Sequence, residues 1–115
     1  VLGMTVERAA AALADVAREE RALVILGAES GSRAWGHPSP DSDWDVRFVY
    51  ARPLAWHTAL APGRDVIERT LPGDLDLDGC ELRKALALLL KGNCALREWF
   101  ASPIRYAEHP LAAEV

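Results

Sequence analysis

The spacing of apolar residues divides the chain into an early helix, a central group of strands and a helical end. Apolar positions at helical spacing predict an amphipathic helix over residues 6–20, and the continuous apolar run at 22–27 predicts a buried strand. Alternation of apolar and polar residues predicts further strands over 43–50, over 64–70 and around 75–77. This order of elements indicates a small α/β or α+β fold in which helices flank a mixed β-sheet.

The apolar pattern returns to helical spacing in the last third of the sequence. Over residues 82–90 it predicts a helix with a wide apolar face, ended by Gly92, and we expect its leucines to lie in the core. Asn93 is expected to cap a second helix that stops before Pro103, and a further helix is expected near Pro110.

The strand predicted over 43–50 has two faces of different character. The apolar face carries Trp44, Val46, Phe48 and Tyr50. Asp43 and Asp45 share the other face, with Cα atoms about 6.5 Å apart. Two carboxylates that close repel each other unless a cation lies between them, and Mg²⁺ prefers oxygen ligands of this kind. The pair therefore predicts a metal site.

A third carboxylate on a neighbouring strand would complete a two-metal site. Asp76 is our candidate, because it falls on a strand expected to lie beside the first. Asp74 and Asp78 share its face, so alternation along the strand does not choose among the three.

A small turn upstream supplies a candidate phosphate site. Gly31 lets the backbone approach a phosphate closely, and Ser32 adds a hydroxyl donor. If a helix begins at Ser32, its free N–H groups face the anion. A phosphate cradle beside metal-binding carboxylates suits phosphoryl or nucleotidyl transfer.

The composition of the chain limits the number of domains and the classes of partner that we expect. The chain has 115 residues and a formal net charge of −4, which fits a single domain over residues 1–115 and argues against binding nucleic acid by electrostatics alone. No apolar run approaches the roughly 20 residues that cross a bilayer. Cys80 and Cys94 are too few for a disulfide framework or a zinc site and are expected to be buried thiols. We expect a cytoplasmic protein with no membrane partner.

Three stretches of the sequence resemble a known family. They are ESGSRAWG at 29–36, SDWDVR at 42–47 and ELRKAL at 81–86, the last followed by Gly-Asn at 92–93 and Glu-Trp at 98–99. Together they resemble the DNA polymerase β-like nucleotidyltransferase superfamily. Within it they are closest to the bacterial and phage predicted nucleotidyltransferases of the RNA-repair-associated polymerase β group.

The resemblance implies a polymerase β-like fold and an enzyme that transfers a nucleoside monophosphate from an NTP, such as ATP, to a hydroxyl acceptor. It implies a two-metal mechanism with Mg²⁺ or Mn²⁺ as cofactor. The implied roles are triphosphate binding by Gly31 and Ser32, metal ligation by Asp43 and Asp45, a third acid at Asp76, and phosphate contacts from Arg33, Arg47 and Lys84.

The sequence also departs from this family. Relatives usually carry proline after the Gly-Asn pair, where Cys94 stands here. Relatives also tend to continue into a C-terminal helical region, so we expect a minimal version or a truncated domain. A non-catalytic or antitoxin-like regulatory module of the same fold, which binds nucleotide or a partner protein, is the alternative. The acceptor (RNA, protein or small molecule), the preferred base and any homo-oligomer stay open.

Overall fold

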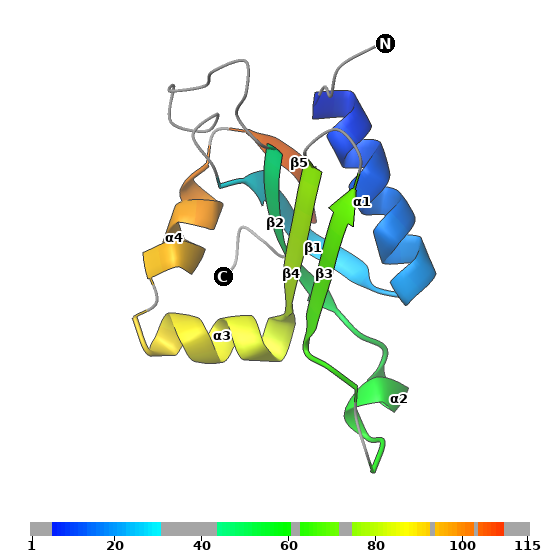
Figure 1. Cartoon of the computed structure of the whole chain (residues 1–115). Coiled ribbons are helices and arrows are strands. Elements are labelled where there is room, and N and C mark those ends of the chain that lie inside the picture. Colours follow the sequence, from blue (N-terminus) through cyan, green and yellow to red (C-terminus); the bar gives the residue numbers. More distant parts are fainter. Residues whose placement is uncertain are drawn as a thin grey trace.

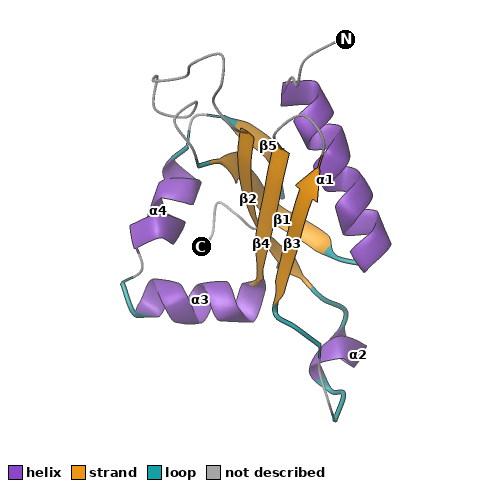
Figure 2. Cartoon of the chain, viewed as in Figure 1, coloured by secondary structure: helices purple, strands orange, loops and turns teal. Residues whose placement is uncertain are grey.

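The computed structural model describes residues 6–30, 44–60, 63–71, 75–92, 94–102 and 104–109. Figures 1 and 2 show a sheet with helices on both of its sides. The elements are α1 (Val6–Glu20), β1 (Leu23–Glu29), β2 (Trp44–Ala51), α2 (Leu54–His57), β3 (Val66–Leu71), β4 (Leu75–Glu81), α3 (Leu82–Leu90), α4 (Cys94–Ala101) and β5 (Arg105–Glu108). The predicted fold class, a mixed sheet flanked by helices, is confirmed.

The described strands form one sheet in the order β3-β4-β2-β1-β5. β2 and β4 run parallel, whereas the other neighbouring pairs are antiparallel. Parallel neighbours cannot be joined by a tight turn, and here the connection passes through α2 and the edge strand β3. Because β2 and β4 run in the same direction, the residues that begin both strands lie side by side at one end of the sheet.

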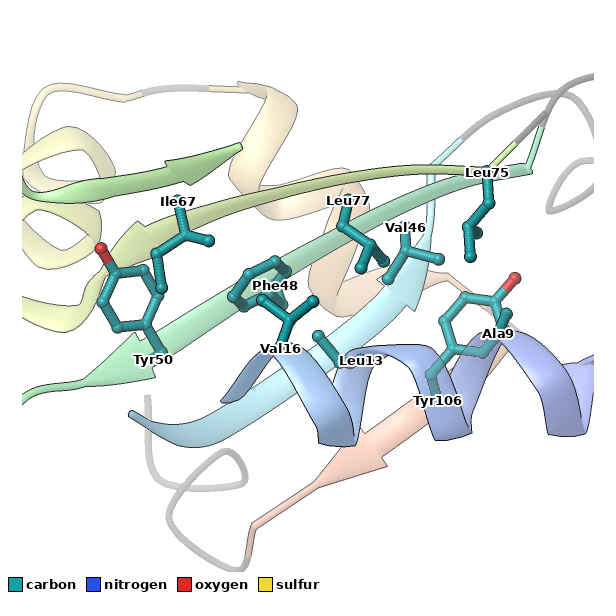
Figure 3. Packing of buried hydrophobic residues seen from close by; sticks show 10 residues of the cluster. All are labelled: Ala9, Leu13, Val16, Val46, Phe48, Tyr50, Ile67, Leu75, Leu77 and Tyr106. Atoms are coloured by element: carbon teal, nitrogen blue, oxygen red, sulfur yellow. The ribbon is translucent and has the colours of Figure 1, made fainter. Parts of the chain in front are cut away.

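Helix α1 covers one face of this sheet. Its buried positions Ala9, Leu13 and Val16 recur at helical spacing, as the sequence pattern predicts. They pack against apolar side chains from four strands: Val46, Phe48, Tyr50, Ile67, Leu75, Leu77 and Tyr106. Figure 3 shows this cluster, with Val16 beside Phe48. The alternation along β2 therefore sends its aromatic face toward α1 and its acidic face away from α1.

The opposite face is partly covered by α3 and α4. Its buried cluster consists of Ile25, Leu26, Val49, Cys80 and Ala85. The prediction that the leucines of 82–90 all lie in the core is wrong for two of them, because Leu86 is 41% exposed and Leu90 89% exposed. Helix α3 leaves the end of β4 (Figure 1), and one side of it, with Ala85, Leu88 and Leu89, packs against this cluster, whereas Leu86 and Leu90, four residues apart, share another side.

The C-terminal segment contains a strand that the sequence pattern did not predict. β5 has only four residues, RYAE, and so short a stretch carries no recognisable alternation. It pairs with β1 at the edge of the sheet and contributes the buried Tyr106. The helix expected near Pro110 and the cap expected at Asn93 lie outside the described residues. Among the described helices, none is long and apolar enough to cross a membrane.

Candidate active site

Asp45 of β2 and Asp76 of β4 lie opposite each other in the parallel ladder. Partners in such a ladder project to the same face of the sheet, with Cα atoms about 4.8 Å apart. Both side chains are half-buried. Their sequence neighbours Val46 and Leu77 lie in the cluster under α1, so the two carboxylates project from the opposite face.

The register distinguishes the acids along β4 that alternation alone left equivalent. Asp76 is in register with Asp45, whereas Asp78 is in register with Arg47. Asp74 lies outside the described residues. The geometry therefore places Asp76, and not Asp78, opposite Asp45, while its role as a third acid stays a prediction.

Two adjacent rows of polar residues continue across the sheet from this pair. In register order they are Asp45, Asp76 and Thr70, then Arg47, Asp78 and Glu68. We call these six residues the polar patch. The next row, Val49, Cys80 and Val66, is apolar, and its first two members pack in the cluster that includes Ala85 of α3. The face is thus polar near the beginnings of β2 and β4 and apolar where α3 covers it.

The polar patch has an excess of negative charge. It holds four carboxylates and one guanidinium, and Nη2 of Arg47 lies 3.8 Å from Oδ1 of Asp45. Within the described part of the chain, the side chains of Asp76 and Asp78 have neither an ion pair nor a hydrogen bond. Neighbouring carboxylates without a countercharge attract a cation, since only a positive charge relieves their repulsion.

A cavity opens over the same rows. Its volume is about 170 Å³, and its lining includes Arg47, Asp76, Asp78 and Thr70. The lining also includes Arg69 and Glu68, so two arginines and three acids meet at this concave surface, whereas Asp45 does not line it. Among the described residues, no group of three or more His, Cys, Asp or Glu is arranged to hold a metal ion.

Sequence reasoning assigned no role to Glu29, which closes β1. Its carboxylate is fully buried. Oε1 accepts a hydrogen bond from Oη of Tyr106 at 2.7 Å, and Oε2 accepts one from the backbone N–H of Asp45 at 3.1 Å. The signal for it was an acidic residue at the end of an apolar strand, within the first of the stretches that resemble the family. Its partner Tyr106 gave no signal, because β5 was not predicted.

A family model described as "RNA repair pathway DNA polymerase beta family" matches residues 5–115. The chain belongs to this family. The family-level resemblance at residues 29–36, 42–47 and 81–86 is confirmed, and the family's name implies the polymerase β-like nucleotidyltransferases as the wider group.

The chain is also similar to one curated protein, over most of its own length. The "Uncharacterized protein YcgL" of Bacillus subtilis (strain 168) is 48% identical over 91 residues, which are 79% of this chain and 35% of that protein. The chain therefore spans 35% of the length of this relative. No solved structure matches the chain.

The remaining residues that the family resemblance singled out fall into two groups. Gly31, Ser32, Arg33 and Asp43 lie outside the described residues. Lys84 lies on α3, where its Nζ is 3.3 Å from Oδ1 of Asp65. Between Asp76 and the start of α3 the strand rises about 16 Å, so the structure does not bring Lys84 to Asp45 and Asp76.

Cys80 is buried, as the sequence indicates. Burial raises the pKa of its thiol to about 11. The thiol therefore keeps its proton at neutral pH and is a poor nucleophile and a poor metal ligand, because both roles need the thiolate. Cys80 is therefore not a candidate for either role.

Proposed function

We propose that this domain is a magnesium-dependent nucleotidyltransferase, which transfers a nucleoside monophosphate from an NTP to a hydroxyl acceptor. The observation that carries the proposal is the pairing of Asp45 with Asp76 on neighbouring parallel strands, in a chain of this family. In the proposed reaction the acceptor oxygen bonds to the α-phosphorus, the bond from that phosphorus to the pyrophosphate oxygen breaks, and the acceptor proton is released.

The donor set of the polar patch fits a hard divalent cation. Asp45 and Asp76 offer carboxylate oxygens on one face, and Asp76 forms no ion pair among the described residues. Asp43, two residues before Asp45 in the sequence, would add a third carboxylate. Bound there, Mg²⁺ would neutralise charge on the phosphates and lower the pKa of the acceptor hydroxyl.

The residues of the chain would divide the remaining work. Arg47 lines the cavity beside Asp76 and Asp78. Its guanidinium would donate two parallel hydrogen bonds to the oxygens of a phosphate group. Asp76 would orient the acceptor hydroxyl. Gly31, Ser32 and Arg33 are proposed to hold the triphosphate through backbone and side-chain donors.

A second candidate function is a module of the same fold that binds nucleotide or a partner protein without turnover. It is favoured by one observation, that Nη2 of Arg47 lies 3.8 Å from Oδ1 of Asp45, so that a side chain of the protein already supplies a positive charge to one of the acids. The two candidates differ in whether the acids are needed for catalysis or only shape a binding surface.

Turnover assays separate the two functions. The protein is incubated with each labelled NTP and Mg²⁺, and release of pyrophosphate and transfer of label to protein or RNA are measured. We expect metal-dependent turnover that falls at least about 100-fold in Asp45→Asn and Asp76→Asn, the scale of a lost electrostatic contact to the transition state. Asp65→Asn, which changes an exposed acid at the other end of the sheet, is the matched control. Nucleotide binding without turnover, unchanged in these variants, would support the binding module.

A further inference from the structure

The side chain of Glu29 binds the backbone of Asp45, a proposed metal ligand. Its carboxylate accepts the N–H of Asp45 at 3.1 Å, and the carbonyl of Asp45 accepts the N–H of Ser30 at 3.0 Å. Both backbone polar groups of Asp45 are therefore held by consecutive residues at the end of β1. A residue whose N–H and carbonyl are both hydrogen-bonded in this way has little freedom to shift along the strand.

The carboxylate of Glu29 lies on the face of the sheet opposite to that of Asp45. Glu29 is in register with Val46, which packs in the cluster under α1 together with Tyr106. Asp45 projects to the other face, toward Asp76. Glu29 therefore does not reach the metal position itself, and any effect on the site passes through the backbone of Asp45.

Tyr106 orients the carboxylate from the C-terminal strand. Its hydroxyl donates to Oε1 at 2.7 Å. Figure 3 shows the Tyr106 hydroxyl directed toward the end of the cluster where Val46 and Leu75 lie, the end at which β2 and β4 begin. This hydrogen bond joins β5 to β1, and the second oxygen of the same carboxylate continues the connection to the Asp45 backbone in β2.

The backbone of Glu29 is also tied to the segment between α4 and β5. Oγ of Ser102 donates to the carbonyl of Glu29 at 2.6 Å, and the N–H of Glu29 donates to the carbonyl of Ile104 at 3.0 Å. Glu29 is thus fixed at its backbone as well as at its carboxylate. The hydrogen bonds from Tyr106 and from the N–H of Asp45 to its carboxylate offset the cost of burying that charged group.

We propose that Glu29 is a positioning residue for the metal site: oriented by Tyr106, its carboxylate fixes the backbone of Asp45 and so sets where the Asp45 carboxylate meets that of Asp76. This inference rests on the proposed function, because it assigns Asp45 to a metal. It makes the C-terminal strand β5 a structural part of the site, although β5 contributes no residue to the polar patch.

The test is the affinity for Mn²⁺ in the presence of an NTP analogue that cannot be cleaved, measured by electron paramagnetic resonance alongside kcat and KM. Loss of a group that orients a ligand typically costs 10- to 100-fold in metal affinity. We expect about a tenfold or larger loss in Glu29→Ala. Glu29→Gln should stay within about threefold of the wild type, because its amide oxygen accepts from Asp45 and its amide N–H donates to Tyr106.

Glu81→Ala is the matched control. Glu81 is the other buried acid of the described sheet, at the opposite end of β4, and it too accepts a hydrogen bond from a backbone N–H. We expect this variant to lower the melting temperature without changing the affinity for Mn²⁺. Tyr106→Phe removes a single hydroxyl and gives an intermediate loss of affinity, so it replaces Glu29→Ala if that variant does not fold.

The outcomes are distinguishable. If Glu29→Ala and Tyr106→Phe bind Mn²⁺ as tightly as the wild type does, the positioning role is overturned while the proposed function stands. If Glu81→Ala loses as much affinity as Glu29→Ala, the effect is general destabilisation and the inference is also overturned. A wild-type protein that neither binds Mn²⁺ nor turns over any NTP refutes the proposed function before any variant is made, and the positioning role with it.

Discussion

Asp45 and Asp76 occupy the same register position on the two parallel strands of the sheet, and Asp76 forms no ion pair within the described residues. Like charges directly opposite each other on neighbouring strands destabilise a sheet. The folded chain thus keeps two carboxylates together where an amide in place of either would be more favourable. Such an arrangement is expected of a site that binds a cation, because selection for function tolerates local instability.

The first prediction follows from this repulsion. Without metal, Asp76→Asn should raise the free energy of unfolding by up to about 1 kcal/mol, because it removes one of two opposed charges. Addition of Mg²⁺ should raise the melting temperature of the wild type, and it should raise the melting temperature of Asp76→Asn much less. Thermal denaturation with and without Mg²⁺ measures both effects. Asp65→Asn should respond to Mg²⁺ as the wild type does, and an equal metal response in Asp76→Asn would contradict the prediction.

Gly79 allows Phe48 to cross β4 closely. A Cβ at this position would lie 2.3 Å from two carbon atoms of the Phe48 ring, which is buried between the sheet and α1. We therefore expect Gly79→Ala to cost about 1–3 kcal/mol, the usual price of overpacking a core, as measured by urea denaturation. Gly63→Ala is the control, since its nearest heavy atom is Nε1 of Trp56 at 3.4 Å. Equal stabilities of the two variants would show that the ring moves aside easily.

Glu81 joins the end of β4 to the start of α3. Its carboxylate is 2% exposed, accepts the N–H of Arg83 at 2.7 Å and lies 3.4 Å from Nε2 of His57. Loss of such a cap typically costs about 0.5–2 kcal/mol, and here it also leaves His57 without its acidic neighbour. We expect Glu81→Ala to lose about 2 kcal/mol in urea denaturation and Glu81→Gln to lose less, because an amide oxygen still caps the helix. If Glu81→Gln lost more stability than Glu81→Ala, the charge of Glu81 would matter more than its capping hydrogen bond.

Much of the fold could be predicted because local patterns carry it. The alternation along β2 correctly assigned its two faces, and the helical spacing of Ala9, Leu13 and Val16 correctly assigned the buried side of α1. Strand β5 could not be predicted, since four residues at a sheet edge contain too little pattern. The exposure of Leu90 also depended on tertiary structure, namely on which side of α3 packs against the sheet, because its neighbours Leu88 and Leu89 do pack there.

Some residues of the candidate site could likewise be predicted from the sequence, and others could not. Asp45 and Asp76 were accessible to sequence reasoning, because side-chain alternation and an adjacent strand sufficed to nominate them. The choice of Asp76 over Asp78 needed the register of β2 against β4, which no local pattern encodes. Glu29 acts through a contact with Tyr106, which lies 77 positions away in the sequence. A partnership over that separation becomes visible only when the strands are assembled.

Glu20 gives the chain a defined loss of stability in acid. The carboxylate at the end of α1 accepts hydrogen bonds from Nη2 of Arg52, at 3.0 Å, and from Nη2 of Arg69. The hydrogen bond from Arg52, assisted by that from Arg69 and opposed by partial burial, holds the pKa of Glu20 below its usual value of 4.5. Because the folded-state pKa is the lower one, this stabilisation is fully present above the unfolded-state pKa and is lost as the pH falls through the folded-state pKa.

Glu20→Gln should therefore be less stable than the wild type at pH 7, by about 1 kcal/mol for a charged hydrogen bond at a partly exposed site. The difference should shrink below pH 4.5 and vanish once the carboxyl of the wild type is protonated. Urea denaturation from pH 7 into the acid range measures it. Asp15→Asn is the control, because Asp15 is an exposed acid of the same helix and its ion pair is with Arg18, one turn away in that helix. A difference between Glu20→Gln and the wild type that stays constant with pH would mean that packing, and not the charge on Glu20, joins α1 to the strands.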